Sequence, residues 1–259
     1  MFKALKSTAM AAGFAAIGAS SHAAPITPTF DSFGALPQAT FGGSGIPNDA
    51  VSITRFTMAN GDEVTLGLSA TPRFSNPALS NDGAGTFTAG AGANDGIPGN
   101  AGTAATWNFS MFASIEPGTG QTTATTTFAE IGLSLYYDFD PAAGTDDAEM
   151  GFIDLAAFEQ LVEPSALDGP GLFEESQNAT FGYLAVDNLF FNFAPDFATF
   201  DPNAPGEYSF AMRAFDRDFA YEASMNVNVV GTSPVPLPAS AFLLLGALGG
   251  LGLMRRKSA

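Results

Sequence analysis

The sequence predicts an all-β fold, an antiparallel β-sandwich over residues 24–231 of a chain of 259 residues. The first observation is a period-two alternation of apolar and polar residues, which is typical of half-buried strands. The second is the frequency of Gly, Pro, Thr and Asn between these runs, which favours short strands joined by turns. The third is the scarcity of long amphipathic helical patterns. A jelly-roll and an immunoglobulin-like arrangement both fit these observations.

Several alternating runs each predict one strand of the sandwich. They are Val64 to Leu68, Trp107 to Ile115, Ile131 to Phe139, Phe181 to Ala185, Tyr208 to Ala214, and Met225 to Val229. Trp107 has apolar residues at alternate positions after it, so we interpret it as a core residue rather than a sugar-stacking platform.

Two stretches depart from this pattern. Apolar residues between Phe152 and Val162 recur at helical spacing and predict a short helix that ends before Pro164. Residues 81–106 are rich in Gly, Ala, Asn and Thr, and they predict a long surface loop.

The charge distribution excludes some classes of partner. All 26 acidic residues lie between Asp31 and Glu222, where the only cations are the four Arg at positions 55, 73, 213 and 217. The body therefore carries a net charge of −22. Such a body repels nucleic acid and anionic membrane surfaces, and it attracts cations. Acidity of this kind also serves simply to keep an exported protein soluble.

The N-terminal residues 1–23 predict a secretory signal peptide. Lys3 and Lys6 precede an apolar run, and Ser21 and Ala23 supply the small side chains that signal peptidase requires around its cleavage site. We expect cleavage after Ala23. The chain is therefore expected to cross the inner membrane.

Residues 232–259 form a three-part tail. It contains the segment Val235, Pro236, Leu237, Pro238 and Ala239, then an apolar stretch from Ala241 to Met254, then Arg255, Arg256 and Lys257. The prolines keep the backbone extended and accessible to a processing enzyme. The apolar stretch predicts a single transmembrane helix of marginal length, and the three cations fix its end on the cytoplasmic side. An unprocessed single-pass anchor is the alternative interpretation.

This tail resembles the PEP-type carboxy-terminal sorting signals of Gram-negative bacteria, in the variant with a Val-Pro-Leu-Pro-Ala motif. Leu237 stands where the main family has Glu. The resemblance implies recognition by an exosortase-like membrane protease, removal of the tail, and release or attachment at the cell surface. It also implies an association with exopolysaccharide or biofilm.

The residue types left in the body exclude several catalytic mechanisms. The one His, His22, lies in the signal peptide, all Lys lie in the two ends, and the chain has no Cys. Residues 24–231 therefore lack the groups for Ser-His-Asp or Cys-His catalysis, for Schiff bases and for His- or Cys-ligated zinc. Only carboxylate chemistry and oxygen ligation of hard cations are left.

The strongest candidate for cation binding is an acidic segment after one predicted strand. Its possible Ca²⁺ ligands are Asp138, Asp140, Asp146, Asp147 and Glu149. Ala142 and Ala143 stand at EF-hand positions that require a ligand and a Gly, so an EF-hand is excluded. A solvated acidic loop without a cofactor is the alternative. A second set, Asp196, Asp201 and Glu207, predicts turn-forming residues.

These observations predict an exported, non-enzymatic protein of the cell surface or extracellular matrix. Its expected partners are signal peptidase, an exosortase-like enzyme and exopolysaccharide, with no nucleic acid. A Ca²⁺-dependent carbohydrate-binding module is the first alternative, and a glycoside hydrolase that uses carboxylates alone is the second.

Overall fold

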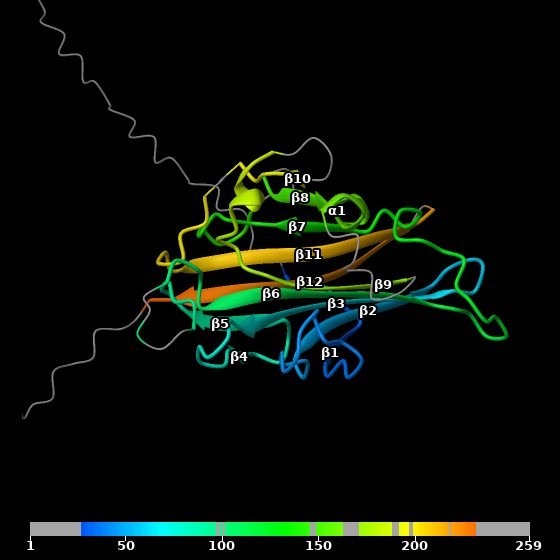
Figure 1. Ribbon diagram of the computed structural model, residues 1–259, viewed down its shortest axis with the longest axis horizontal. Helices are drawn as coiled ribbons and strands as arrows, with labels where there is room; N and C mark the ends of the chain where they lie inside the picture. Colours follow the sequence, from blue (N-terminus) through cyan, green and yellow to red (C-terminus); the bar gives the residue numbers. More distant parts are fainter. Residues whose placement is uncertain are drawn as a thin grey trace, which may run out of the picture.

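The computed structural model describes residues 27–96, 99, 102–145, 149–162, 171–187, 192–196, 199–217 and 219–231. The predicted signal peptide and sorting tail lie outside the described residues, as do Asp146 and Asp147. The described chain is mostly β-strand, in two sheets (Figure 1). The all-β prediction is therefore confirmed.

Sheet A has five strands in the order β1-β2-β3-β6-β9. Their bounds are β1 Ser32–Gly34, β2 Val51–Thr57, β3 Glu63–Pro72, β6 Trp107–Glu116 and β9 Leu172–Gln177. All neighbours in this sheet pair antiparallel. The long pair β3 and β6 runs from Glu63 opposite Glu116 to Pro72 opposite Trp107, and this pair forms the centre of the sheet.

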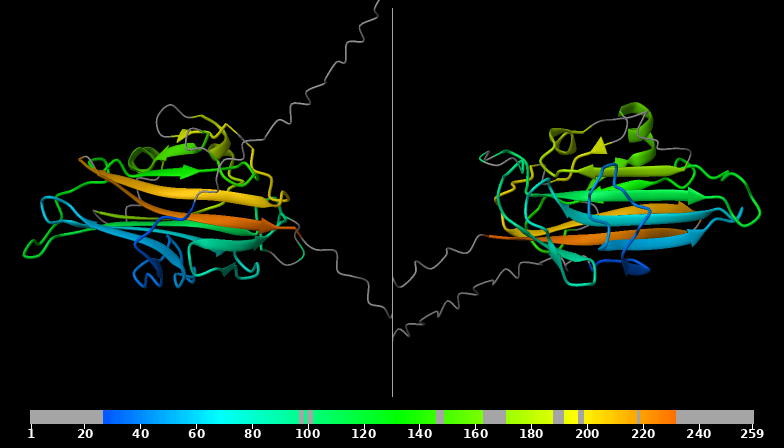
Figure 2. Two further views of the ribbon diagram at one scale, coloured as in Figure 1. Left: turned by 180° about the vertical axis from the view of Figure 1, so that it is seen from behind. Right: turned by 60° about the horizontal axis from the view of Figure 1, so that its bottom comes forward.

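Sheet B has seven strands in the order β10-β8-β7-β11-β12-β5-β4. Their bounds are β4 Ser80–Asn81, β5 Thr86–Gly90, β7 Ser134–Tyr137, β8 Gly151–Asp154, β10 Asn192–Phe193, β11 Gly206–Asp216 and β12 Phe219–Val230. The hairpin of β11 and β12 is the longest pairing in this sheet. Figure 2 shows the two sheets as stacked layers from two further directions.

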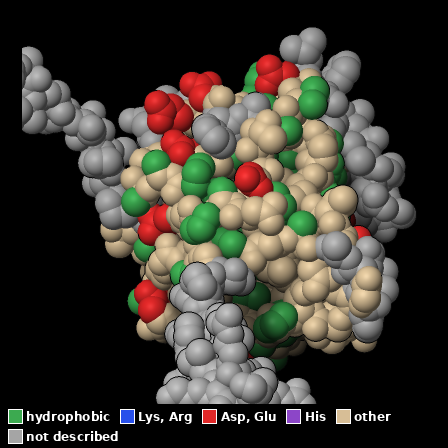
Figure 3. Space-filling model, turned by 90° about the vertical axis from the view of Figure 1, so that its left-hand side faces the viewer, with side chains coloured by type: hydrophobic (Ala, Val, Ile, Leu, Met, Phe, Trp, Pro, Cys, Tyr) green, Lys and Arg blue, Asp and Glu red, His purple; other side chains and the backbone are tan. Residues whose placement is uncertain are grey.

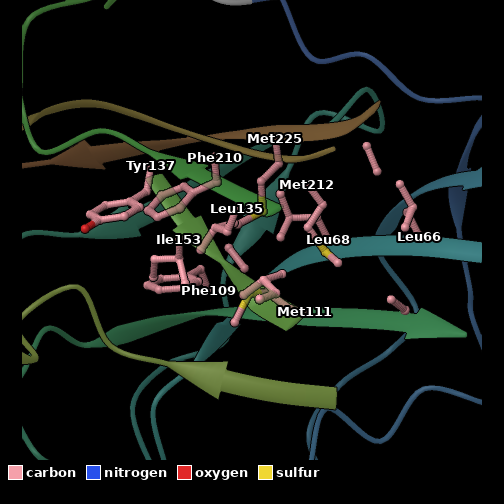
Figure 4. Packing of buried hydrophobic residues seen from close by; sticks show 14 of the residues in the cluster. Leu66, Leu68, Phe109, Met111, Leu135, Tyr137, Ile153, Phe210, Met212 and Met225 are labelled. Atoms are coloured by element: carbon pink, nitrogen blue, oxygen red, sulfur yellow. The ribbon is translucent and has the colours of Figure 1, made fainter. Parts of the chain in front are cut away.

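One apolar interior lies between the two sheets. Figure 4 shows side chains from β3 and β6 pointing toward side chains from β7, β8, β11 and β12. Trp107 and Phe109 of β6 both contact the ring of Phe210 on β11, with centroid distances of 5.9 and 4.8 Å. Trp107 is 1% exposed, which confirms its assignment to the core. Each fully buried side chain of this size contributes about 1.5–3 kcal/mol to folding.

The helices are short. The α-helix α1 spans Leu155–Val162 and directly follows β8, so the predicted helix forms only over the second part of its pattern. Its first turn begins where Asp154 accepts a hydrogen bond from the Ala157 amide at 2.9 Å. No helix in the described part of the chain is both long and apolar enough to cross a lipid bilayer.

Two sequence predictions are wrong. Gly182–Ala185 forms a 3₁₀ helix instead of a strand, with Leu184 buried. The predicted loop 81–106 contains β5, whose Phe87 and Ala89 enter the core. Moreover, β5 pairs parallel with β12, so the sandwich is antiparallel everywhere except at this pair. A strand with one large apolar residue among Thr, Ala and Gly gives too weak an alternation to be recognised.

A second, smaller apolar cluster covers the outer face of sheet A. Leu36, Ala39 and Phe41, from the segment after β1, pack on Val51, Ile53 and Phe112 of the sheet. This segment is held by Glu174 of β9, which is 4% exposed. The Glu174 carboxylate accepts hydrogen bonds from the Thr40 amide and hydroxyl, both at 2.6 Å, and from the Phe41 amide at 3.3 Å.

The same turn holds Phe41 in a strained conformation. Its φ of +52° lies in the left-handed region, which costs a non-Gly residue about 1–2 kcal/mol. Phe41 is nevertheless 1% exposed, because the Glu174 carboxylate and the apolar cluster fix both its backbone and its ring. Glu174 therefore connects an edge strand of sheet A to the segment that covers that sheet.

We expect Glu174→Ala to lower the free energy of unfolding by about 2–4 kcal/mol, since it leaves three donors without their charged acceptor. Urea unfolding of the purified chain measures this loss. Glu116→Ala, which removes an exposed carboxylate at the end of β6, is the matched control and should change the value by less than about 0.5 kcal/mol. Equal unfolding midpoints for the two variants would show that Glu174 does not hold the segment.

Candidate functional site

The acidic segment predicted as a cation site begins where β7 ends. Asp138 is 1% exposed, and its amide donates to the Ser209 carbonyl of β11 at 3.0 Å. Its carboxylate accepts hydrogen bonds from the Asp140 amide at 2.7 Å and from the Thr145 hydroxyl at 2.6 Å. Asp140 in turn accepts from the Ala142 amide at 2.9 Å. Both carboxylates therefore shape the turn that leaves the strand.

Burial raises the pKa of Asp138 to about 6, although its hydrogen bonds from Thr145 and Asp140 act in the opposite direction. The negative charges of Asp140 and Glu207 raise it further. Asp138 is thus a buried carboxyl group without a nearby cation to stabilise its ionised form. A bound cation or a retained proton would each relieve this repulsion.

Glu207 on β11 belongs to this cluster, although the sequence predicted only turn formation for it. Its Oε1 atom is buried and has no hydrogen-bond partner among the residues that the structure describes, and desolvation raises the pKa of Glu207. Its amide donates to the Pro141 carbonyl at 3.3 Å, which brings it beside the acidic segment. Asp201 does form the predicted turn, since it accepts from the Asn203 amide at 2.9 Å.

The structure places only part of the predicted ligand set. Asp138 and Asp140 are adjacent, whereas Glu149 is exposed and its carbonyl accepts a hydrogen bond from the Asp196 amide. Within the described ranges, no group of three or more His, Cys, Asp or Glu could hold a metal ion. Because Asp146 and Asp147 are outside those ranges, the five-residue Ca²⁺ site stays a prediction. Figure 3 shows the end of the molecule on the left of Figure 1, with Asp and Glu scattered over it and no Lys or Arg in view.

Asp62 is a buried carboxylate whose pKa is lowered, in contrast to that of Asp138. It lies in the turn between β2 and β3, where it is inaccessible to solvent. Its Oδ2 accepts from the amides of Thr126 and Thr125 at 2.8 and 2.9 Å, and from the Asn60 side chain at 2.8 Å. These hydrogen bonds, the Thr126 amide first, lower the pKa of Asp62 to about 2 despite its burial. Asp62 therefore connects the turn to the segment around Thr125.

The described surface also has two grooves. The larger, of about 770 Å³, lies between the end of β6, residues 122–129 and the start of β9, and Glu116 is the one acidic residue in its lining. The smaller, of about 420 Å³, contains Arg55, Glu63 and Glu116, all exposed. Glu63 and Glu116 are cross-strand neighbours. Neither of these two carboxylates is buried.

An aromatic row, which the sequence analysis missed, crosses the outer face of sheet B. It consists of Phe193 on β10, Phe152 on β8, Tyr136 on β7 and Arg213 on β11. Ring centroids lie 6.2 Å apart between Phe193 and Phe152, and 5.2 Å apart between Phe152 and Tyr136. The Arg213 guanidinium carbon lies 4.3 Å from the centre of the Tyr136 ring, and its Nε donates to Glu222 at 2.7 Å.

The signal for this row was present in the alternation itself. Leu135 and Tyr137 point into the core, so Tyr136 must point outward, and register places Phe152 beside it. The outward residues form a row only through the pairing of β7, β8 and β10, which no single run of the sequence indicates.

No family model, no curated protein and no solved structure matches this chain. What the chain does is therefore inferred from its own residues, chiefly those of the terminal segments, the acidic cluster and the aromatic row.

The raised pKa of Asp138 makes stability depend on pH. The unfolded chain releases this proton near pH 3.8, whereas the folded chain keeps it up to about pH 6. The contribution of protonated Asp138 to the free energy of unfolding is therefore complete below pH 3.8 and is lost as the pH rises through 6. Its total is on the order of 2–3 kcal/mol.

We expect Asp138→Asn to remove this pH dependence, because its amide stays neutral throughout. The variant should unfold at higher urea concentration than the wild type at pH 7 and at a similar concentration at pH 4. Glu63→Gln, at an exposed position at the start of β3, is the control and should follow the wild type. Parallel pH profiles for wild type and Asp138→Asn would contradict the assignment.

Proposed function

We propose that this chain is an exported, non-enzymatic protein of the cell surface or extracellular matrix that is processed through its C-terminal sorting tail. The observation that carries the proposal is the tail sequence, in which Val235 to Ala239 precede an apolar stretch and the cations Arg255 to Lys257. An exosortase-like membrane enzyme is the expected processing partner.

Processing at both ends would leave every described strand intact. The last strand, β12, ends at Val230, before Val235. The first strand, β1, begins at Ser32, after the predicted cleavage at Ala23. The body would then be left at the cell surface or in the medium.

The chemistry of the body supports a non-catalytic role. Residues 24–231 contain no His, Lys or Cys, and the two described grooves offer only exposed carboxylates. A carboxylate-only glycoside hydrolase needs a buried acid paired with a second carboxylate in a groove. It is the less favoured alternative, because Asp138 and Glu207, the acids whose pKa values burial raises, line neither groove. For the two-sheet fold, a jelly-roll and an immunoglobulin-like topology are the two proposed assignments.

The intact mass of the protein recovered from the producing cells and their medium tests the proposal. We expect a mass that lacks residues 1–23 and the apolar stretch from Ala241 onward, because both segments are processing signals. A variant with Pro236→Ala and Pro238→Ala should retain its tail and stay in the membrane fraction. Recovery of the wild type in the cytosol with both ends intact would overturn the proposal.

A second candidate function is a Ca²⁺-dependent carbohydrate-binding module. The buried, unpartnered Oε1 of Glu207 beside Asp138 favours it, since a cation there would compensate two carboxylates with raised pKa values.

Under this second function, millimolar CaCl₂ should raise the melting temperature of the wild type at pH 7, because binding to the folded state alone stabilises it. Glu207→Gln should remove the increase, whereas Glu63→Gln, at an exposed position, should leave it unchanged. If CaCl₂ shifts all three proteins equally, or none of them, the Ca²⁺ site is excluded.

A further inference from the structure

The aromatic row lies on a face that the core does not use. Along β7, Leu135 and Tyr137 are buried between the sheets, and Tyr136 points to the other side. On β8, Phe152 has Tyr136 and Phe193 as its cross-strand neighbours on that face. Phe193 is 51% exposed, and Tyr136 and Phe152 are partly exposed. The strands that carry the row, β10, β8, β7 and β11, follow one another in the upper part of Figure 1.

The row combines flat apolar surfaces with polar groups at one end. Its three rings come from adjacent strands, and the planar guanidinium of Arg213 continues the row over Tyr136. Glu222 then holds that guanidinium from β12. Phe215, which is 42% exposed, lies two residues beyond Arg213 on the same face. Such a surface can pack against rings and form hydrogen bonds at its edge in one contact.

Size argues against a second protein as the occupant. From β10 to β11 the row crosses three strand spacings, which is about 14 Å. A row one side chain wide and of this length buries far less than the roughly 800 Å² per partner of a stable protein interface. It is, however, as long as a short oligosaccharide in extended conformation.

Charge argues for a neutral ligand. The body carries 26 acidic residues against four Arg, so it repels anionic chains and other copies of itself. An uncharged polysaccharide does not meet this repulsion. Its sugar rings present apolar C–H faces to aromatic side chains and hydroxyl groups to carboxylates and guanidinium groups.

We propose that the outer face of sheet B binds a neutral polysaccharide along Phe193, Phe152, Tyr136 and Arg213. Sugar rings pack on Phe193 and Phe152, the two rings that the Arg213 guanidinium does not cover, and the hydroxyl groups of the next unit form hydrogen bonds with Tyr136, Arg213 and Glu222. The inference rests on the proposed function, because only an exported chain meets extracellular polysaccharide. Binding of the polysaccharide at the row needs no Ca²⁺, since the row and the acidic cluster at Asp138 involve different residues.

Affinity electrophoresis of the full chain tests this site, in native gels that contain hydroxyethylcellulose, galactomannan, xyloglucan or dextran. We expect at least one of these neutral polysaccharides to retard the wild type, with and without EDTA, and an alginate gel not to do so. Phe152→Ala should weaken the retardation about tenfold, as the loss of a central stacking contact does.

Two further variants control for folding and for non-specific stacking. Phe193→Ser removes the most exposed ring of the row and should weaken binding without lowering the melting temperature. Phe74→Ala removes a ring that is 74% exposed after β3, outside the row, and should bind as the wild type does.

The proposal is overturned if none of the four gels retards the wild type, or if Phe74→Ala and Phe152→Ala lose binding equally. Concentration-dependent self-association that Phe152→Ala abolishes would instead assign the row to a second copy of the chain. Absence of binding by a protein whose two ends are correctly processed would refute this site and leave the proposed function standing.

Discussion

The whole structure depends on one constraint, the burial of a single face of each sheet against the other. The long strands β3, β6, β11 and β12 supply most of the shared interior, and their side chains alternate strictly between the two faces. Once Leu66, Phe109 and Phe210 are directed inward, the alternation determines on which face of the sheet every other residue of their strands lies. The outward positions are thereby left for other uses, such as the second apolar cluster on sheet A and the aromatic row on sheet B.

This constraint also explains how much could be predicted from sequence. The strands around Leu66, Phe109, Met212 and Val227 were predicted correctly because each run alternates over several residues. The 3₁₀ helix at Gly182–Ala185 was not, because Phe181 and Tyr183 at alternate positions imitate a strand, although the buried residue is Leu184, which follows them. Likewise, β5 was missed because it is held mainly by its backbone pairing with β12, and the sequence of β5 alone does not indicate that pairing.

The candidate site was predictable only in part, because proximity in space decides it. Sequence placed Asp138 and Asp140 at a strand end, where the structure also has them. Glu207, however, is brought to Asp138 by the pairing of β7 with β11, and no local pattern indicates that pairing. The aromatic row is likewise assembled by strand pairing, since Phe193, Phe152 and Tyr136 come from three separate parts of the chain.

Asp62 and Asp138 illustrate that burial alone does not set the charge of a carboxyl group. Both are inaccessible to solvent, yet the pKa is lowered for Asp62 and raised for Asp138. Asp62 accepts hydrogen bonds from two backbone amides and a side-chain amide through one oxygen. For Asp138, the effect of burial outweighs its two hydrogen bonds, and two acidic neighbours add to it. The balance between burial, donors and nearby charges therefore decides which buried acid is ionised.

The position of β12 has a mechanical consequence. This strand lies inside sheet B, with β11 on one side and β5 on the other, and the chain continues from its end at Val230 toward the C-terminus. Any tension applied through that end is directed along the strand axis, across the hydrogen bonds to both neighbours at once. These bonds are loaded in shear together instead of opening one after another, so the body can resist a pull applied through its C-terminal end.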